Sequence, residues 1–322
     1  MTQRLFPIPL SDLLARRARL LGGGLATWAA RRDLPPPPAP SPNGHLDARE
    51  DQGADRMSLP PPTSRNRAVV TGASSGIGTA LAEHLAARGH SLILIARRED
   101  RLRELADRLA QRHRVEAEVY ACDLGDRDAR AKLVADLAAR DIAVLCNNAG
   151  FATYGPLSTL DAQREGLQVE LDVVAVHELT LAVLPGMLER KAGAILITGS
   201  TAGNQPGPNN TTYAASKAFA NTFAESLHAE LAGTGVGCTL LAPGPVKTEF
   251  THAAEAPGLD RLVPGPLWVS ADAAARQAIT GMAKGKRRVV PGPFAKAQTL
   301  SGLYGPRWIS ASVLRAVYRR VK

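Results

Sequence analysis

Tyr213 and Lys217 are four residues apart, and the surrounding sequence predicts a helix over about residues 213–232. Side chains at this spacing share one face of a helix. An unperturbed tyrosine has a pKa of about 10, too high for ready proton transfer near neutrality, and a neighbouring ammonium group lowers it. The pair therefore suits a phenol that acts as an acid or a base. A lone Tyr-x-x-x-Lys arises by chance on many helices, so it needs support from other residues.

Ser200 lies thirteen residues before Tyr213 and follows an apolar run, Ala194–Thr198, that predicts a buried strand. A hydroxyl just after such a strand would project at the carboxyl edge of a sheet, where open α/β folds bind their ligands. In isolation Ser200 would be interpreted as an ordinary loop serine. Beside Tyr213 and Lys217 it is the third candidate catalytic residue.

A glycine-rich turn stands between an apolar run, Ala68–Thr71, and a predicted helix, Ile77–Arg88, which Gly89 closes. Glycines let the backbone turn tightly and approach a pyrophosphate, and the amides at the helix N-terminus point at the phosphates. Such a turn alone is weak evidence, but a strand before it and a helix after it make it strong. The candidate phosphate-binding residues are Gly72, Ser74, Ser75, Gly76, Ile77 and Gly78.

Arg97 and Arg98 follow the second predicted strand, Ser91–Ala96, where an NAD-preferring site usually has an acidic residue. Two arginines offer charge and bidentate geometry for the 2′-phosphate of NADP(H). The alternative is a pair of solvated arginines that open a helix. Asp123, after the third strand, is a candidate acceptor for the adenine amino group, or else a turn residue.

Residues 147–150, Asn-Asn-Ala-Gly, close the fourth predicted strand, Ile142–Cys146. Small residues would let a cofactor lie against the backbone there, and an asparagine would tie neighbouring strands by side-chain hydrogen bonds. Asn148, Ala149 and Gly150 are therefore candidate cofactor-binding residues, although the motif alone could be a polar turn.

The elements that position these residues are short apolar runs that alternate with helical patterns from residue 67 onward. Such alternation indicates a parallel sheet covered on both faces. Right-handed crossovers then give a doubly wound α/β fold, with ligands at the carboxyl ends of the strands. The remaining predicted strands are Glu118–Cys122, Val236–Ala242 and Arg288–Val290, and the remaining helices span about 101–112 and 164–189.

In their order and spacing, the motifs over residues 66–295 resemble the short-chain dehydrogenase/reductase family, in its shorter, single-domain branch. The motifs are Gly72-x-x-x-Gly76-x-Gly78, Asn147-Asn148-Ala149-Gly150, Ser200, Tyr213-x-x-x-Lys217 and Pro243–Thr248. The resemblance implies a seven-stranded Rossmann sheet and hydride transfer between nicotinamide C4 and a carbonyl carbon. The protein would then be an oxidoreductase that interconverts a carbonyl and an alcohol. The resemblance also implies a homodimer or homotetramer formed through the helices at about 164–189 and 213–232.

The resemblance also implies roles for the matching residues. Tyr213 would give or take the proton, Ser200 would polarise the carbonyl oxygen, and Lys217 would lower the Tyr213 pKa and bind the cofactor ribose. The residues that would line the cofactor or lie near its carboxamide are Asn148, Val246 and Thr248.

Asp172 is a departure from the family pattern. The family usually has an asparagine in the segment that matches Leu171–Ala175, where it supports a water relay behind the lysine. Asp172 could pair with Lys217 and weaken its effect on Tyr213, or it could still hold the water as an acceptor of similar shape. Asp172 is therefore a candidate catalytic residue, with an expected shift of the pH optimum.

The composition narrows the partners and the compartment. The formal charge of +9 indicates a generally basic surface, a contact with acidic lipid or a nucleic-acid partner, and no recognition motif supports nucleic acid. The cysteines are three and widely spaced, and no histidine cluster accompanies them, which favours a reducing, cytoplasmic setting and no metal site. No run of about 18 apolar residues appears, so no membrane span is expected.

Three segments lie outside the motifs. Residues 1–65 form a basic, proline-rich extension expected to be largely disordered, whose amphipathic start suits a membrane surface, a targeting signal or a functionless tail. Residues 249–270 form an expected substrate lid, whose apolar side chains favour a lipophilic ketone or acyl substrate or merely exclude water. Residues 296–322 form a basic helical tail with an apolar stripe that could contact acidic lipid peripherally, the domain or a second subunit. The stripe consists of Val313, Leu314, Val317, Tyr318 and Val321.

A function of a different class remains open at this point. The chain could be a catalytically silent NADP-binding protein that senses redox state or serves as a scaffold. The intact Ser200, Tyr213 and Lys217 argue against this alternative, whereas Asp172 and the appended segments leave room for it.

Overall fold

The computed structural model describes residues 59–249, 265–306, 308, 311–312 and 315. The expectations for residues 1–58, for lid residues 250–264 and for tail residues 307, 309–310, 313–314 and 316–322 lie outside the described residues. The apolar stripe expected from Val313 to Val321 is among them.

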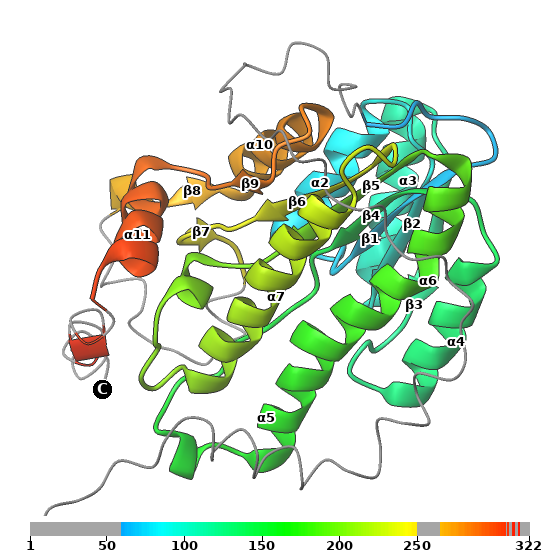
Figure 1. The fold of residues 1–322 in the computed structure, drawn as a ribbon. Helices are drawn as coiled ribbons and strands as arrows, with labels where there is room; N and C mark the ends of the chain where they lie inside the picture. The colour runs from blue at the N-terminus through cyan, green and yellow to red at the C-terminus, as the bar shows by residue number, and fades with distance from the viewer. Residues whose placement is uncertain (1–58, 250–264, 307, 309–310, 313–314, 316–322) are drawn as a thin grey trace, which may run out of the picture. The chain divides into compact units, whose positions relative to one another are not determined.

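Seven parallel strands form the central sheet in the order β3-β2-β1-β4-β5-β6-β9 (Figure 1). Every predicted strand matches an observed one to within a residue at either end, because a short apolar run marks a strand buried on both faces. The chain moves outward from β1 to β3 and then returns to β4, and this reversal opens the crevice where doubly wound folds bind ligands. The predicted doubly wound α/β Rossmann fold is confirmed. The strands are β1 (Arg67–Thr71), β2 (Leu92–Ala96), β3 (Ala117–Ala121), β4 (Ile142–Asn147), β5 (Gly193–Thr198), β6 (Val236–Leu241) and β9 (Arg288–Val289).

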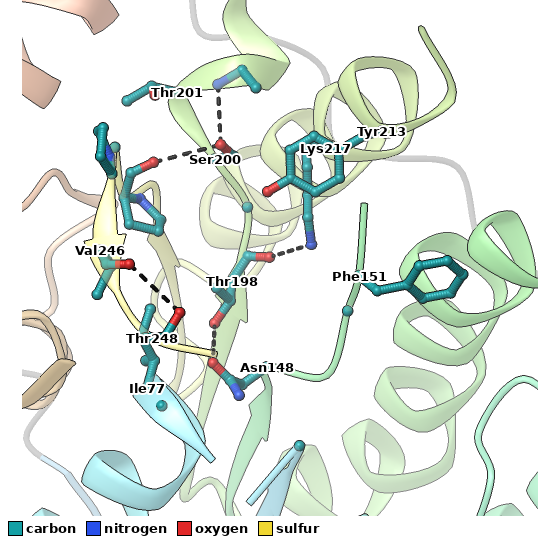
Figure 2. Close-up of a pocket in the computed structure, with 18 of the residues that line it drawn as sticks. Ile77, Asn148, Phe151, Thr198, Ser200, Thr201, Tyr213, Lys217, Val246 and Thr248 are labelled. Carbon is teal, nitrogen blue, oxygen red and sulfur yellow. Dashed lines mark hydrogen bonds between the residues drawn. The ribbon is translucent and has the colours of Figure 1, made fainter. Parts of the chain in front are cut away.

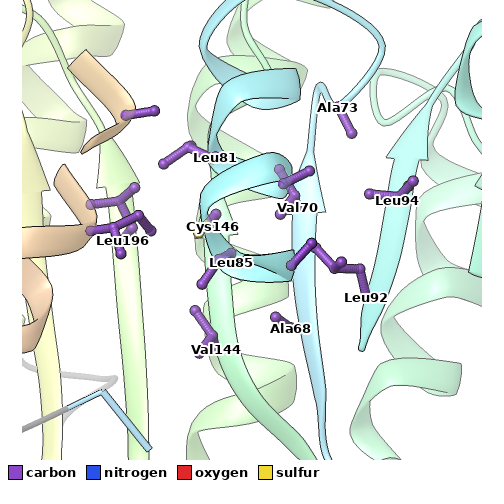
Figure 3. Packing of buried hydrophobic residues seen from close by; sticks show 14 of the residues in the cluster. Ala68, Val70, Ala73, Leu81, Leu85, Leu92, Leu94, Val144, Cys146 and Leu196 are labelled. Carbon is purple, nitrogen blue, oxygen red and sulfur yellow. The ribbon is translucent and has the colours of Figure 1, made fainter. Parts of the chain in front are cut away.

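Helices cover both faces of this sheet, and β1 shows how its residues divide between them. Ala68 and Val70 belong to one buried apolar cluster and Val69 to the other, as the two-residue period of a strand requires. The first cluster includes Leu81 and Leu85 of α2 (Figure 3) and side chains of α3 and α10, whereas α4, α6 and α7 contribute to the second. The helices are α2 (Gly76–Ala86), α3 (Glu99–His113), α4 (Arg127–Ala138), α5 (Ala162–Val169), α6 (Ala175–Arg190), α7 (Thr211–Glu230), α10 (Ala271–Ala283) and α11 (Pro293–Tyr304).

The long helix predicted at 164–189 is interrupted. A π-helical turn, Glu170–Val174, separates α5 from α6 and carries the buried Asp172. One extra residue in a turn leaves the apolar pattern on both sides almost unchanged, so periodicity did not reveal it. By length and mean hydropathy (1.6), Ala162–Arg190 is apolar enough to cross a membrane, but here α6 packs on α4 and β4.

Several helix ends differ by up to two residues from the expectation. α2 ends at Ala86, two residues before Arg88, and Gly89 follows with a φ of +86° that suits the left-handed turn after a helix. α7 begins two residues before Tyr213, at Thr211. Ends are the least certain part of a helix because capping and fraying decide them locally.

The ordered domain extends beyond both boundaries expected from the sequence. Leu59 packs on the first apolar cluster, and the Asn66 side chain accepts from Thr63 N–H and donates to the Pro61 carbonyl, so residues 59–65 are not a disordered linker. The boundary expected between residues 295 and 296 falls inside α11.

A small second sheet lies beside the main one. Val246–Lys247 (β7) pairs in parallel with Val269–Ser270 (β8), which brings both ends of the expected lid together. Two-residue strands carry too little pattern to be recognised in a sequence.

Candidate active site

A cavity of about 900 Å³ lies at the carboxyl ends of the strands and gathers nearly all the predicted site residues. Among those named from the sequence, only Gly78 and Asp172 do not line it. The predicted residues that do are Gly72, Ser74, Ser75, Gly76, Ile77, Arg97, Arg98, Asp123, Asn148, Ala149, Gly150, Ser200, Tyr213, Lys217, Val246 and Thr248.

Gly78 shapes the phosphate end of the cavity from outside. A Cβ at this position would lie 2.1 Å from the Gly72 carbonyl oxygen, so only glycine lets α2 approach β1 this closely. Gly72 and Gly76 adopt φ values of +67° and +56°, which glycine accepts without strain. The Ser75 side chain makes no capping hydrogen bond at the start of α2, which leaves that helix end facing the cavity.

The arginines after β2 point in two directions. Arg98 donates to the Ser74 hydroxyl (3.1 Å) and carbonyl (3.3 Å) in the glycine-rich turn, and it also pairs with Glu249. Arg97 instead lies 3.9 Å from Asp123, with both side chains largely exposed. The hydrogen bond from Arg101, and to a smaller extent the one from Arg98, lowers the pKa of Glu249 below its usual range.

Asn148 and Thr71 join three strands beneath the cavity. The Asn148 side chain donates to the Thr71 carbonyl (3.1 Å) and accepts from the Thr198 hydroxyl (3.4 Å), which links β4 to β1 and β5. The Thr71 hydroxyl accepts from the backbone N–H groups of Asn148 and Ala149, both at 2.9 Å. The strand-tying role expected for an asparagine is thus confirmed for Asn148.

Ser200 is held at the end of β5 by Asn221 of α7. Asn221 accepts from Ser200 N–H (3.2 Å) and donates to the Ser200 carbonyl (2.9 Å), which fixes this backbone from both sides. The Ser200 hydroxyl accepts from Ala202 N–H and makes only a long contact, 3.5 Å, to the Pro243 carbonyl. Its proton therefore has a weak intramolecular partner that a ligand oxygen can replace.

Tyr213 and Lys217 share one face of α7, as predicted. The Lys217 Nζ lies 5.6 Å from the centroid of the Tyr213 ring and donates to the Thr198 carbonyl at 3.2 Å. In Figure 2 the Tyr213 hydroxyl is directed toward the side of the cavity where Ser200 lies. Because both side chains are almost fully buried, charge on Lys217 acts on the phenol with little screening by water.

Asp172 lies behind this group, fully buried, with its Oδ2 3.7 Å from Lys217 Nζ. Burial raises the pKa of Asp172 to about 6, while Lys217 and the Phe151 N–H oppose the rise. A Cβ on Gly150 would stand 2.8 Å from the Asp172 carboxylate and 3.1 Å from Lys217 Nζ, so glycine permits this approach. The 3.7 Å approach to Lys217 is compatible with the expected ion pair, and Asp172 Oδ2 accepts no hydrogen bond from the described residues, so it is also placed to hold a water.

The lining of the cavity is mostly apolar. It includes Phe151 and Tyr154 after β4, Trp268 before β8 and Phe294 of α11. α11 is anchored beside the catalytic group by a 2.7 Å hydrogen bond from the Thr201 hydroxyl to Gln298. The expected tail thus contributes to the pocket.

Sequence reasoning missed Thr71, Asn221, Arg101 and Glu249. For Asn221 a signal was present, since it follows Lys217 by four residues and lies on the face that carries Tyr213. The partners of the other three lie at least 75 residues away in the chain. Local patterns cannot show such contacts.

The arrangement can hold a dinucleotide and move a proton. A ligand with a pyrophosphate fits the glycine-rich turn, where Gly72, Gly76 and Gly78 carry no side chain, and the Arg98 guanidinium lies beside this turn through its hydrogen bonds to Ser74. At the other end, a hydroxyl, a phenol and an ammonium group surround one space. The site therefore combines nucleotide binding with acid–base chemistry.

Comparisons with known proteins agree with this geometry. The description "short chain dehydrogenase" matches residues 66–257. Sulfoacetaldehyde reductase 2 of Chromohalobacter salexigens is 42% identical over 187 residues, 57% of this chain and 73% of that protein. Very-long-chain 3-oxoacyl-CoA reductase of Anas platyrhynchos is 36% identical over 217 residues, 66% of this chain and 69% of that protein. A short-chain dehydrogenase from Sphingobium yanoikuyae in complex with NADPH has 30% identity and a TM-score of 0.67, covering 79% of this chain and 95% of that one.

The matched segment, residues 66–257, spans more than half of the chain. It contains the glycine-rich turn, the four candidate catalytic residues and β7. The chain therefore belongs to the short-chain dehydrogenase/reductase family of oxidoreductases, which interconvert carbonyl and alcohol groups.

Proposed function

We propose that this protein is an NADP(H)-dependent oxidoreductase that interconverts a lipophilic ketone or acyl substrate and the corresponding alcohol. The observation that carries the proposal is the single cavity that joins Ser200, Tyr213 and Lys217 to the glycine-rich turn and Arg98. Binding and proton transfer can thus occur in one cavity.

The proton chemistry falls to three residues. In reduction, the Tyr213 hydroxyl gives its proton to the substrate oxygen while the Ser200 hydroxyl donates a hydrogen bond to it. The positive charge of Lys217 stabilises the resulting phenolate, and this electrostatic attraction is strong because the site is buried. When bound, the nicotinamide supplies or accepts the hydride at the substrate carbon. In oxidation, the proton moves the other way.

The preference for NADP(H) rests on Arg98. Its guanidinium is held at the glycine-rich turn by Ser74, and a planar fork of N–H donors suits a 2′-phosphate. The first acidic residue after β2 is Glu99, which pairs with Arg103. The relative from Sphingobium yanoikuyae that binds NADPH supports the same preference.

The lipophilic substrate class rests on the mostly apolar lining of the cavity, which includes the aromatic residues Phe151, Tyr154, Trp268 and Phe294. A hydrocarbon chain gains about 0.8 kcal/mol for each methylene group that such a lining buries. The very-long-chain 3-oxoacyl-CoA reductase relatives are consistent with this class, whereas the sulfoacetaldehyde reductase relative has a small, charged substrate.

The test is NADPH oxidation by the full chain against straight-chain ketones of increasing length, with sulfoacetaldehyde included. We expect kcat/KM to rise about fourfold per added methylene until the cavity is filled. Tyr213→Phe should lower kcat at least about 100-fold, whereas Tyr120→Phe, outside the cavity, should not. A preference for sulfoacetaldehyde would contradict the substrate class. NADPH binding without turnover of any ketone or of sulfoacetaldehyde would favour the silent-sensor alternative.

We also propose that the chain forms a homodimer or homotetramer through α5, α6 and α7. Leu167, Leu181 and Leu188 of the first two helices are exposed apolar side chains that an interface would cover. Leu181→Glu should yield a monomer by light scattering, whereas Leu157→Glu, equally exposed but outside these helices, should not. A monomeric parent protein would contradict the proposal.

We also propose that the protein is located in the cytoplasm and contacts anionic lipid at the membrane surface. α11 exposes Leu300, Leu303 and Tyr304, which do not line the cavity, and residues 293–322 contain six Lys or Arg and no acidic residue. We expect the full chain to float with phosphatidylserine vesicles and not with phosphatidylcholine vesicles. The double variant Leu300→Ser, Leu303→Ser should not float, whereas the control variant Leu157→Ser should float like the parent protein. Equal flotation of these variants would exclude α11 as the contact.

A further inference from the structure

Glu249 bridges two arginines at the nucleotide end of the cavity. Arg98 donates to it at 2.9 Å, and Arg101 donates to both of its oxygens at 2.7 and 2.9 Å. Glu249 lines the cavity, whereas Arg101 reaches it from the first turn of α3. A carboxylate bound by two guanidinium groups is the arrangement that these groups would offer to a phosphate.

The same arginine is the one that the proposed function assigns to the 2′-phosphate. Arg98 contacts the glycine-rich turn through Ser74 and Glu249 through its remaining N–H groups. Since guanidinium donors are fixed in number and direction, a phosphate bound by Arg98 must share or replace the hydrogen bonds made to Glu249. Two anions held by the same pair of arginines also repel each other.

We propose that Glu249 competes with the 2′-phosphate of NADP(H) for Arg98 and Arg101, and that Arg101 is a second phosphate-binding residue. Glu249 thereby sets how strongly the protein prefers NADP(H) over NAD(H). This inference rests on the proposed NADP(H) preference. A phosphate carries nearly two negative charges and three acceptor oxygens, so it displaces a single carboxylate from the pair.

Glu249 would have a different effect if it only held the arginines in position. Removing its charge would then loosen Arg98 and Arg101 and weaken NADPH binding. Under competition, removing the charge strengthens NADPH binding instead. The sign of the change therefore separates the two roles.

The experiment measures dissociation constants of NADPH and NADH for the full chain by titration calorimetry. All three side chains are partly exposed, so the competition is modest, and Glu249→Gln should tighten NADPH binding about three- to tenfold. The NADH dissociation constant should stay within about twofold of the parent value, because NADH has no 2′-phosphate. Glu99→Gln is the matched control, since it removes a charge from the start of α3 but contacts Arg103 rather than Arg98 or Arg101.

Arg101→Ala tests the second half of the proposal. It should weaken NADPH binding at least about threefold without affecting NADH, whereas Arg103→Ala should affect neither. Weaker NADPH binding in Glu249→Gln, or equal tightening in Glu99→Gln, would overturn the competition. Unchanged NADPH binding in Arg101→Ala would remove Arg101 from the site. If the parent protein bound NADH as tightly as NADPH and Arg98→Ala changed neither, the proposed cofactor preference itself would fail.

Discussion

Lys217 interacts with two oxygen groups that have opposite consequences for Tyr213. Its bond to the Thr198 carbonyl leaves its charge intact, whereas the Asp172 carboxylate at 3.7 Å partly neutralises that charge when ionised. Because the pKa of Asp172 is raised to about 6, the carboxylate is protonated in mildly acidic solution and ionised above that range. The chemistry of Tyr213 should therefore depend on the state of Asp172.

Asp172→Asn removes that negative charge at every pH. We expect the apparent pKa that governs kcat/KM for alcohol oxidation to fall by about one unit, because Lys217 then favours the phenolate without opposition. The measurement is the pH profile of kcat/KM, with Asp128→Asn on the exposed start of α4 as the control. An unchanged profile would indicate that Asp172 acts only as a hydrogen-bond acceptor.

Asn221 is a positioning residue for Ser200. Asn221→Ala removes both hydrogen bonds to the Ser200 backbone and leaves these buried groups unsatisfied, at a cost of about 1–3 kcal/mol in unfolding free energy. We expect kcat to fall at least about tenfold as Ser200 loses its alignment, with little change in the NADPH dissociation constant. Thr222→Ala, on the exposed side of α7, is the control. Loss of NADPH binding in Asn221→Ala would point to a wider structural role.

At the scale of elements, the site depends on how closely α2 approaches β1. The clearance at Gly78 is so small that a methyl group must move the backbone of the Gly72 turn. The π-helical turn has a comparable role at the other end, because it carries Asp172 toward Lys217 and Gly150. In both places a glycine leaves room that a side chain would fill: Gly78 for the Gly72 turn, and Gly150 for the side chains of Asp172 and Lys217.

Gly78→Ala tests the approach of α2 to β1. We expect it to lower stability by more than about 2 kcal/mol and NADPH affinity at least about tenfold, measured by urea unfolding and by titration. Gly166→Ala is the matched control, since nothing lies within 4 Å of a Cβ there and alanine is favoured in a helix by about 1 kcal/mol. Retained NADPH affinity in Gly78→Ala would show that the turn can adjust.

At the scale of the whole molecule, the buried Asp172 links stability to pH. Its folded pKa of about 6 lies above the ordinary 3.8, so folding favours the protonated form. The stability it contributes is complete below about pH 4 and is lost as the pH rises through about 6.

We therefore expect the unfolding free energy of the parent protein, relative to Asp172→Asn, to fall by about 2–3 kcal/mol between pH 4 and pH 7. Urea unfolding of both proteins at each pH provides the measurement. A difference that does not change with pH would mean that the pair with Lys217 offsets the effect of burial.

The sequence by itself determined the sheet, the glycine-rich turn and the candidate catalytic residues Ser200, Tyr213 and Lys217. Strands buried on both faces are short apolar runs, and Tyr213 and Lys217 share a helix, so local order along the chain carries both signals. Asn148 was likewise found from its place at the end of a strand.

Only the tertiary structure decided which distant side chains meet. Glu249 meets Arg98 across 151 positions, Asp172 meets Lys217 through a π-helical turn, and α11 brings Gln298 to Thr201. The physical reason is that such contacts depend on how separate elements cross at the sheet edge, and a local pattern contains no information about that crossing. The reaction class follows from residues near one another in the chain. The proposed cofactor preference and the proposed pH dependence of Tyr213 depend instead on residues that only folding brings together.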